Sequence, residues 1–140
     1  MGGKGGKAKA LRLLARAMGI ACVAIGLLHV VGGNAAIPGA QDAGATVDSL
    51  GRFLGAAFAG YGLTWLWVAR QTPVPATAVR VLIGVFLLGG LARVLSIAVA
   101  GWPHGFQVAL MVVELTLSPV YFWLADADEE AARSALPART

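Results

Sequence analysis

Two charged residues in apolar surroundings are the first candidates for chemistry. Arg93 lies in the segment GGLARVLS, and Glu114 lies in the segment LMVVELTL. A charged side chain at the centre of a bilayer costs about 2.5 to 3.5 kcal/mol on insertion scales, so such residues pair with one another or mark a substrate or proton path. The chemistry to consider is therefore ion pairing, the binding of an anionic head group by the guanidinium, or proton transfer to the carboxylate.

Other polar residues extend these two into a candidate ligand-binding set: Arg52, Arg93, Glu114, Gln107, His29 and His104. The two histidines have the chemistry to ligate a haem, or to join Asp48 or Glu114 around a metal. Neither spacing is diagnostic, however, and histidines near a tryptophan are typical of a membrane interface. Asp48, four residues before Arg52, favours a helix cap and a local ion pair. We therefore expect no cofactor and no metal.

Motifs that carry their own catalytic chemistry are absent from the sequence. Cys22 is the single cysteine, so it forms neither an internal disulfide nor a CxxC pair. There is no HExxH, glycine-rich phosphate loop, GxSxG or calcium-loop pattern. The sequence favours a non-catalytic protein over an enzyme.

Apolar helices must position these residues, because the composition indicates a membrane protein. Hydrophobic residues make up 58% of the chain and charged residues 13%, whereas a soluble domain carries about 25% charged residues. A helix crosses a bilayer with about 20 mainly apolar residues, and the segments that qualify are 13–32, 50–69, 79–101 and 106–125. We predict an all-α, four-transmembrane-helix bundle over residues 13–125, a flexible basic tail at 1–12 and a charged tail at 126–140.

The distribution of basic residues predicts the orientation. Lysines and arginines crowd the start of the chain, and Arg70 and Arg80 flank the second connection, whereas the first and third connections contain neither residue type. Basic flanks stay on the cytoplasmic side, so both termini are expected there, in a multi-pass protein of the cytoplasmic membrane. We attribute the formal net charge of +4 mostly to these basic residues, which hold the cytoplasmic ends of the spans in place. We therefore expect no nucleic-acid partner. Cleavage of the first span as a signal peptide is an open alternative, which would leave three spans.

Helical periodicity gives each span one small or polar stripe, which we expect to face inward. Arg93 lies about 12 Å below the outer boundary at 1.5 Å per residue, and Glu114 lies at a similar depth in the next, antiparallel span. We therefore predict a structural ion pair between Arg93 and Glu114, completed by Ser96, Ser118 or Gln107. A small-residue pattern at Gly51, Gly55 and Ala59 fits either ordinary helix packing or a homo-oligomer seam.

Three segments carry a family resemblance: GRFLGAAFAGYGL, GGLARVLSIAVAGWP and ELTLSPV, in this order. Over residues 17–125 the chain resembles the small bacterial integral membrane family catalogued as domain of unknown function 4345. The resemblance implies a compact four-helix protein of a bacterial inner membrane. The positions that match the family's pattern are Arg52, Arg93, Gly101, Pro103, Glu114 and Pro119. The resemblance implies no reaction, because the family looks functionally unassigned.

Two functions remain open at this point. The first is a non-catalytic helical-bundle protein, an accessory or assembly component of a larger membrane complex or a homo-oligomer, held by the Arg93–Glu114 pair. The alternative is a binder of, or an enzyme acting on, a lipophilic small molecule in an outward-facing polar pocket. In that case Arg52 and Arg93 would hold an anionic head group and Glu114 would accept a proton. The lipid bilayer is a partner in both.

Overall fold

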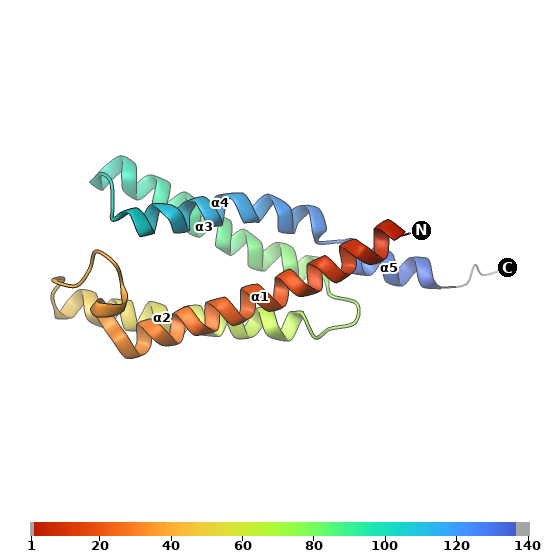
Figure 1. Cartoon of the computed structure of the whole chain (residues 1–140), viewed down its shortest axis with the longest axis horizontal. Coiled ribbons are helices and arrows are strands. Elements are labelled where there is room, and N and C mark those ends of the chain that lie inside the picture. Colours follow the sequence, from red (N-terminus) through yellow and green to blue (C-terminus); the bar gives the residue numbers. More distant parts are fainter. Residues whose placement is uncertain (1, 137–140) are drawn as a thin grey trace.

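The computed structural model describes residues 2–136, and its regular elements within this range are all helices. The long helices are α1 (Gly2–Gly32), α2 (Ala45–Val68), α3 (Ala76–Ala100) and α4 (Gly105–Leu124). A short 3₁₀ helix, η1 (Gly33–Ala36), follows α1, and α5 (Ala127–Ala135) follows α4. Figure 1 shows two antiparallel hairpins, α1–α2 and α3–α4, lying side by side, with α5 beside the start of α1.

Three segments of the described chain are long and apolar enough to cross a membrane: Gly5–Ala36, Ala76–Ala100 and Gly105–Ala135. They contain α1, α3 and α4, so the structure is that of an all-helical, membrane-type protein. The second predicted span, 50–69, corresponds to α2, which has 24 residues but is not among the three. The four glycines of α2 and its tryptophans and tyrosine contribute little hydropathy, although Gly51, Gly55, Gly62 and Trp65 are buried in the structure.

Both predicted tails contain helix within the described residues. α1 begins at Gly2, so residues 2–12 are helical rather than an irregular tail. At 31 residues and 1.5 Å per residue, α1 is about 46 Å long, which exceeds the roughly 30 Å hydrocarbon core. The acidic run after residue 125 forms α5, in which Ala127 and Asp128 are buried. Residues 137–140 of the predicted charged tail, with Arg139, lie outside the described residues.

Glycines let α1 and α2 approach until their backbones touch. A Cβ atom added to Gly26 would lie 2.5 Å from the backbone nitrogen of Ala59 and 2.5 Å from the carbonyl oxygen of Gly55. A Cβ atom added to Gly62 would lie 2.7 Å from the carbonyl oxygen of Gly19. We call these contacts the glycine seam. Since Gly55 and Ala59 pack against α1 of their own chain, ordinary helix packing accounts for them, and no oligomer seam is needed.

The hydrophobic core joins the two hairpins in the half of the molecule nearest α5. Its fully buried large side chains include Leu11 of α1, Trp65 of α2, Ile83 of α3 and Tyr121 of α4. The hydroxyl of Tyr121 donates a 2.7 Å hydrogen bond to the carbonyl oxygen of Leu14. Buried hydroxyls need such partners, and this bond ties α4 to α1. Toward the opposite end the two ribbons diverge (Figure 1).

Candidate functional site

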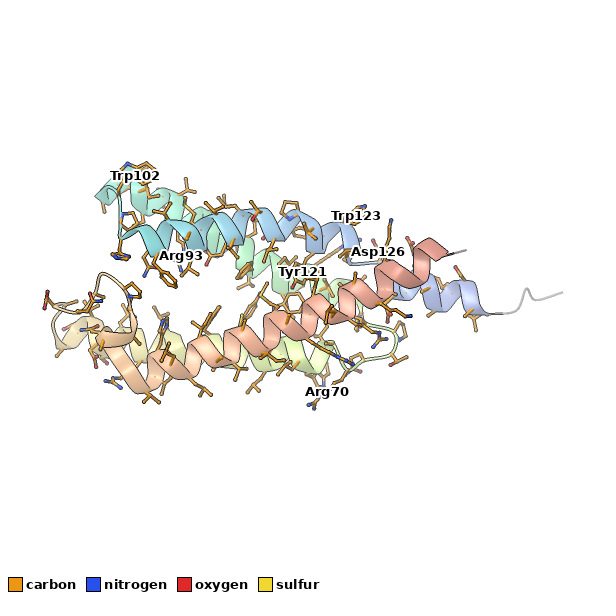
Figure 2. The ribbon with its side chains drawn as sticks, viewed as in Figure 1. Arg70, Arg93, Trp102, Tyr121, Trp123 and Asp126 are labelled. Atoms are coloured by element: carbon orange, nitrogen blue, oxygen red, sulfur yellow. The ribbon has the colours of Figure 1, made fainter. Side chains whose placement is uncertain are left out.

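The Arg93 and Glu114 side chains are in contact between α3 and α4. Arg93 Nε donates to both carboxylate oxygens of Glu114, at 3.2 Å to Oε1 and 3.0 Å to Oε2. Arg93 Nη1 donates to Gln107 Oε1 at 2.7 Å. The Glu114 side chain is 13% exposed and the Arg93 side chain 35% exposed. Figure 2 shows Arg93 on the side of α3–α4 that faces the other hairpin.

A glycine pair in α3 allows this contact. Gly90 is buried, and a Cβ atom there would lie 3.1 Å from the Cβ of Glu114 and 3.0 Å from a terminal methyl of Leu115. A Cβ atom on Gly89 would lie 3.9 Å from Glu114 Oε2. The close approach of α4 at this point brings the carboxylate within reach of Arg93, one turn farther along α3.

Gln107 connects this cluster to the segment between α1 and α2. Its Nε2 donates to the carbonyl oxygen of Pro38 at 3.4 Å, while its Oε1 accepts from Arg93. Ser96, Ser118 and Gln107 were the predicted hydrogen-bond partners of the ion pair, and of these only the Gln107 side chain bonds to it among the described residues. Ser118 Oγ instead donates to the backbone carbonyl of Glu114 at 2.6 Å, and Ser96 is exposed without a hydrogen-bond partner among the described residues.

Arg52 belongs to a different cluster, at the end of α1. It pairs with Asp48 at 2.7 Å and donates to the carbonyl oxygens of Val30 at 2.6 Å and Val31 at 3.1 Å. The last carbonyls of a helix have no partner within it, and a cation there is favourable. Arg52 therefore caps α1 and does not join Arg93 in one site.

Asp48 completes this cap from the first turn of α2. Its Oδ1 accepts a 2.9 Å hydrogen bond from the backbone N–H of Asn34. The hydrogen bond from the Arg52 side chain, followed by the one from Asn34, holds the pKa of the Asp48 carboxyl below its usual range. The carboxylate therefore stays charged, and it fixes the turn after α1.

The two histidines have separate surroundings. His29 lies on α1 against Gly55, where a Cβ atom on that glycine would lie 2.7 Å from the Cβ of His29. His104 caps α4, with its Nδ1 accepting from the backbone N–H of Phe106 at 3.2 Å, and it packs on Gly39. Within residues 2–136, no three side chains of the ligating types lie together as a metal site.

A second polar cluster, which the sequence interpretation missed, joins the start of α1 to α5. Arg12 forms a two-pronged pair with Asp128, from Nε to Oδ1 at 3.1 Å and from Nη2 to Oδ2 at 2.6 Å, and its Nη1 donates to the carbonyl of Gln71 at 3.0 Å. Asp128 Oδ2 also accepts from the backbone N–H of Val74 at 2.7 Å. We call this the Arg12–Asp128 lock.

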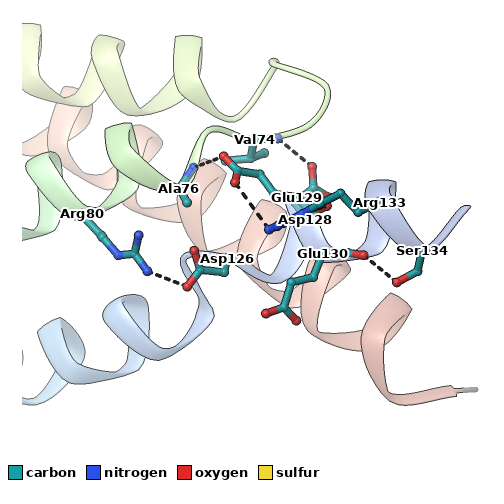
Figure 3. Close-up of polar contacts among 9 residues, drawn as sticks. All are labelled: Val74, Ala76, Arg80, Asp126, Asp128, Glu129, Glu130, Arg133 and Ser134. Atoms are coloured by element: carbon teal, nitrogen blue, oxygen red, sulfur yellow. Dashed lines mark hydrogen bonds and ion pairs between the residues drawn. The ribbon is translucent and has the colours of Figure 1, made fainter. Parts of the chain in front are cut away.

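Neighbouring acidic residues of the same run extend the lock onto α3 (Figure 3). Glu129 accepts a 2.9 Å hydrogen bond from the backbone N–H of Ala76, in the first turn of α3. Asp126 pairs with Arg80 at 2.5 Å. Carboxylates are favoured at helix N-termini, where N–H groups lack partners. The acidic run DADEE was therefore a usable sequence signal. The first N–H groups of a helix such as α3 need acceptors, and a nearby run of carboxylates can supply them.

Chemically, the described residues offer ion pairs and caps rather than an activated nucleophile. The one cysteine, Cys22, is buried in the core. Two surface hollows lie away from Arg93 and Glu114. One is lined by α2 residues around Ser49 and Phe53, and the other lies between the start of α1 and α5, around Lys7 and Glu130.

Comparison with known proteins places most of the chain in one family. The family model described as Domain of unknown function (DUF4345) matches residues 10–125. This range contains the glycine seam, the Arg93–Glu114 pair and the Arg52 cap, whereas α5 lies beyond it. No curated protein and no solved structure matches the chain.

Proposed function

The chain belongs to the DUF4345 family, and we propose that it acts as a non-catalytic, multi-pass component of a bacterial cytoplasmic (inner) membrane. In this proposal it is an accessory or assembly subunit of a larger membrane complex or of a homo-oligomer. The Arg93–Glu114 pair is its internal clamp, which fixes the helices rather than acting on a substrate.

The proposed topology has four spans with both termini in the cytoplasm. α1, α3 and α4 are apolar enough to cross by themselves. α2 is the fourth span, because the glycine seam holds it against α1 through Gly26 and Gly55 and again through Gly19 and Gly62. A helix in backbone contact with a spanning helix over this length occupies the same depth. The basic residues at the α5 end support the cytoplasmic side for that end.

The observation that carries the proposal is that the Arg93 and Glu114 side chains, in the middle of α3 and α4, bond to their own chain. Among the described residues, the Glu114 carboxylate accepts from Arg93 alone, and Arg93 also donates to Gln107, which in turn reaches Pro38. Together these bonds join α3, α4 and the segment between α1 and α2. A clamp of this kind fixes register at some cost in desolvation. A catalytic carboxylate, by contrast, needs access to a proton donor or acceptor.

Paired and single substitutions test the clamp. We expect Arg93→Met alone and Glu114→Gln alone to lower the thermal midpoint in detergent, because each leaves an unpaired group in the apolar region. The double variant Arg93→Met with Glu114→Gln should recover much of that loss. Arg133→Gln, which alters an exposed arginine with a 4.0 Å contact, is the control. Native mass spectrometry of the same samples reports the copy number and any partner.

Two results would overturn this function. A double variant as unstable as the worse single variant would show that the two residues do not act as a pair. A wild-type protein that is always a monomer without a protein partner, both in gently solubilised membranes and by cross-linking in cells, would exclude the assembly role.

A lipophilic-ligand binder is the second candidate, favoured by one feature of Arg93. Its side chain is 35% exposed, and its Nη2 has no hydrogen-bond partner among the described residues. A guanidinium has five N–H donors, and donors left free in an apolar layer favour an acceptor from outside the chain. A discrete extra mass in the native spectrum that Arg93→Met removes would support this candidate. An absorption spectrum of the same sample tests for haem at the histidines.

A further inference from the structure

The face of α1 that points away from the core carries cations among exposed apolar residues. Lys9, Leu13, Arg16 and Ile20 follow one another at intervals of four, three and four residues, so they form one stripe. All four are exposed, Leu13 at 69% and Ile20 at 62%. The buried residues of α1, such as Met18, lie on a different side.

The end of α2 and the turn after it carry a matching set of exposed residues at the same end of the hairpin, with Leu63 and Trp67 on α2 and Arg70 just after its last residue, Val68. Leu63, Trp67 and Arg70 are spaced by four and three residues and are all exposed, with Trp67 at 61%. Figure 2 shows Arg70 pointing away from the α3–α4 hairpin. This set is distinct from the core side of α2, which carries Trp65 and Val68.

The glycine seam places the stripe on α1 and the matching set at one level. It sets Gly19 beside Gly62 and Gly26 beside Gly55. Because the two helices are antiparallel, a residue seven positions later in α1 lies at the level of a residue seven positions earlier in α2. Arg70 therefore lies at about the level of residue 11, between Lys9 and Arg16. At 1.5 Å per residue the three cations span about 10 Å along the axis, enough to cover the roughly 5 to 8 Å of the polar head-group layer on one side of a bilayer.

These three cations differ from their neighbours in having no acidic partner. Arg12, Arg80 and Arg133 pair with residues of the DADEE run. Within the described chain, by contrast, Lys9, Arg16 and Arg70 form no ion pair and no side-chain hydrogen bond. Asp126, Asp128 and Glu129 at this end of the molecule are directed to the lock and to α3, so these three carboxylates do not neutralise this face.

We propose that Lys9, Arg16, Arg70 and Trp67 form a binding surface for the head group of an anionic phospholipid. Guanidinium groups bind phosphate oxygens in a planar, two-pronged manner. Tryptophan rings favour the head-group level, and lipid chains cover the apolar residues above them. Clustered cations beside a spanning helix attract anionic lipids by about fivefold in affinity for each Lys or Arg. This surface is independent of the Arg93–Glu114 clamp.

The test is lipid binding by the full chain in neutral detergent, followed by native mass spectrometry. The probes are phosphatidylglycerol and phosphatidylcholine with identical acyl chains, each titrated separately, and inorganic phosphate in excess as a competitor. Arg16→Gln and Arg70→Gln are the test variants, Arg16→Lys retains the charge, and Arg133→Gln removes one exposed cation elsewhere. Circular dichroism and the thermal midpoint verify that each variant is folded.

The expected result is tighter binding of phosphatidylglycerol than of phosphatidylcholine. Each Gln variant should weaken phosphatidylglycerol binding about fivefold, and the two combined about 25-fold. Arg133→Gln should bind nearly as the parent does, and Arg16→Lys, which keeps the charge but loses the two-pronged contact, should lose less affinity than Arg16→Gln. Equal binding of the two lipids, or an equal loss in Arg133→Gln, would overturn the proposal. Displacement of the lipid by inorganic phosphate would also overturn it, since the surface would then recognise a free anion.

Discussion

Replacing Asp128 by Asn should destabilise the protein more than any other single isosteric change at the α5 end. Asp128 Oδ2 accepts from both Arg12 Nη2 and the Val74 N–H, and Oδ1 accepts from Arg12 Nε. An amide removes the negative charge and one acceptor. It therefore leaves the Arg12 guanidinium unpaired, with 25% of that side chain exposed, and places an N–H₂ group against donors.

The magnitude follows from the burial of the two partners. Removing one member of a fully buried ion pair costs about 3 to 5 kcal/mol. The Asp128 side chain is 9% exposed and Arg12 is 25% exposed, so solvent screens part of this interaction. We expect a loss of about 2 to 3 kcal/mol in the free energy of unfolding, equivalent to a roughly 30- to 150-fold change in the folded-to-unfolded ratio.

Denaturant titration in mild detergent, monitored by tryptophan fluorescence, measures this change. The control Arg133→Gln affects an arginine that is 69% exposed and 4.0 Å from its partner, and it should shift stability by less than about 0.5 kcal/mol. Adding Arg12→Met to Asp128→Asn should restore part of the loss, because the stranded guanidinium is then gone. A single variant Asp128→Asn as stable as the parent would refute the reasoning that the lock holds α1 to the segment before α3.

Two further predictions concern other parts of the fold. Gly26→Ala places a methyl 2.5 Å from backbone atoms of α2 and should cost about 1 to 3 kcal/mol in the same titration. Gly60→Ala, where nothing lies within 4 Å, should be neutral or stabilising by up to about 1 kcal/mol; equal losses in both would exclude a specific seam. The pKa of Asp48 is lowered in the folded state, so its contribution to stability is present above the unfolded value and is lost as pH falls through the folded value. Asp48→Asn should reduce the acid dependence of the thermal midpoint below about pH 4, and an unchanged profile would contradict the assignment.

Apolar length predicted the helical class and three of the membrane-type helices, because hydropathy over 20 residues is a local property. Family membership was predicted correctly from short motifs and is confirmed over residues 10–125. α2 was harder to judge, since its glycines and aromatic residues lower the mean hydropathy, while Gly55 and Gly62 allow close contact with α1. Hydropathy measures transfer into lipid, whereas these residues act through their fit to another helix.

The sequence predicted the contacts of the candidate site only where two residues lie at the same depth in the membrane on neighbouring helices. Arg93 and Glu114 were placed at similar depths on consecutive antiparallel helices, and in the structure they are in contact. Arg52 was grouped with them because periodicity indicated an inward stripe. The structure instead directs its guanidinium to the carbonyls at the end of α1, a position that depends on where α1 ends.

The Arg12–Asp128 lock could not be predicted from local sequence patterns, because it also depends on how distant segments pack together. Its two residues are 116 positions apart in the chain, and each belongs to a segment whose composition is typical of a solvated tail. The glycine seam had a signal that went unused, since Gly19 and Gly26, like Gly55 and Gly62, are seven residues apart. A seven-residue repeat of small residues puts them on one face of each helix, where two helices can approach closely.

The seam has a consequence for how the protein is made. In the proposed topology, α2 leaves the ribosome as a segment of modest apolar character, after a strongly apolar α1. We expect α1 to supply the surface on which α2 enters the bilayer, so that the two helices insert together as one hairpin. Glycosylation mapping with acceptor sites placed after α2 would report this directly. Gly26→Leu should make α2 fail to insert in a measurable fraction of chains, so that α2 is carried across the membrane and the site after it is glycosylated, whereas Gly60→Leu should not.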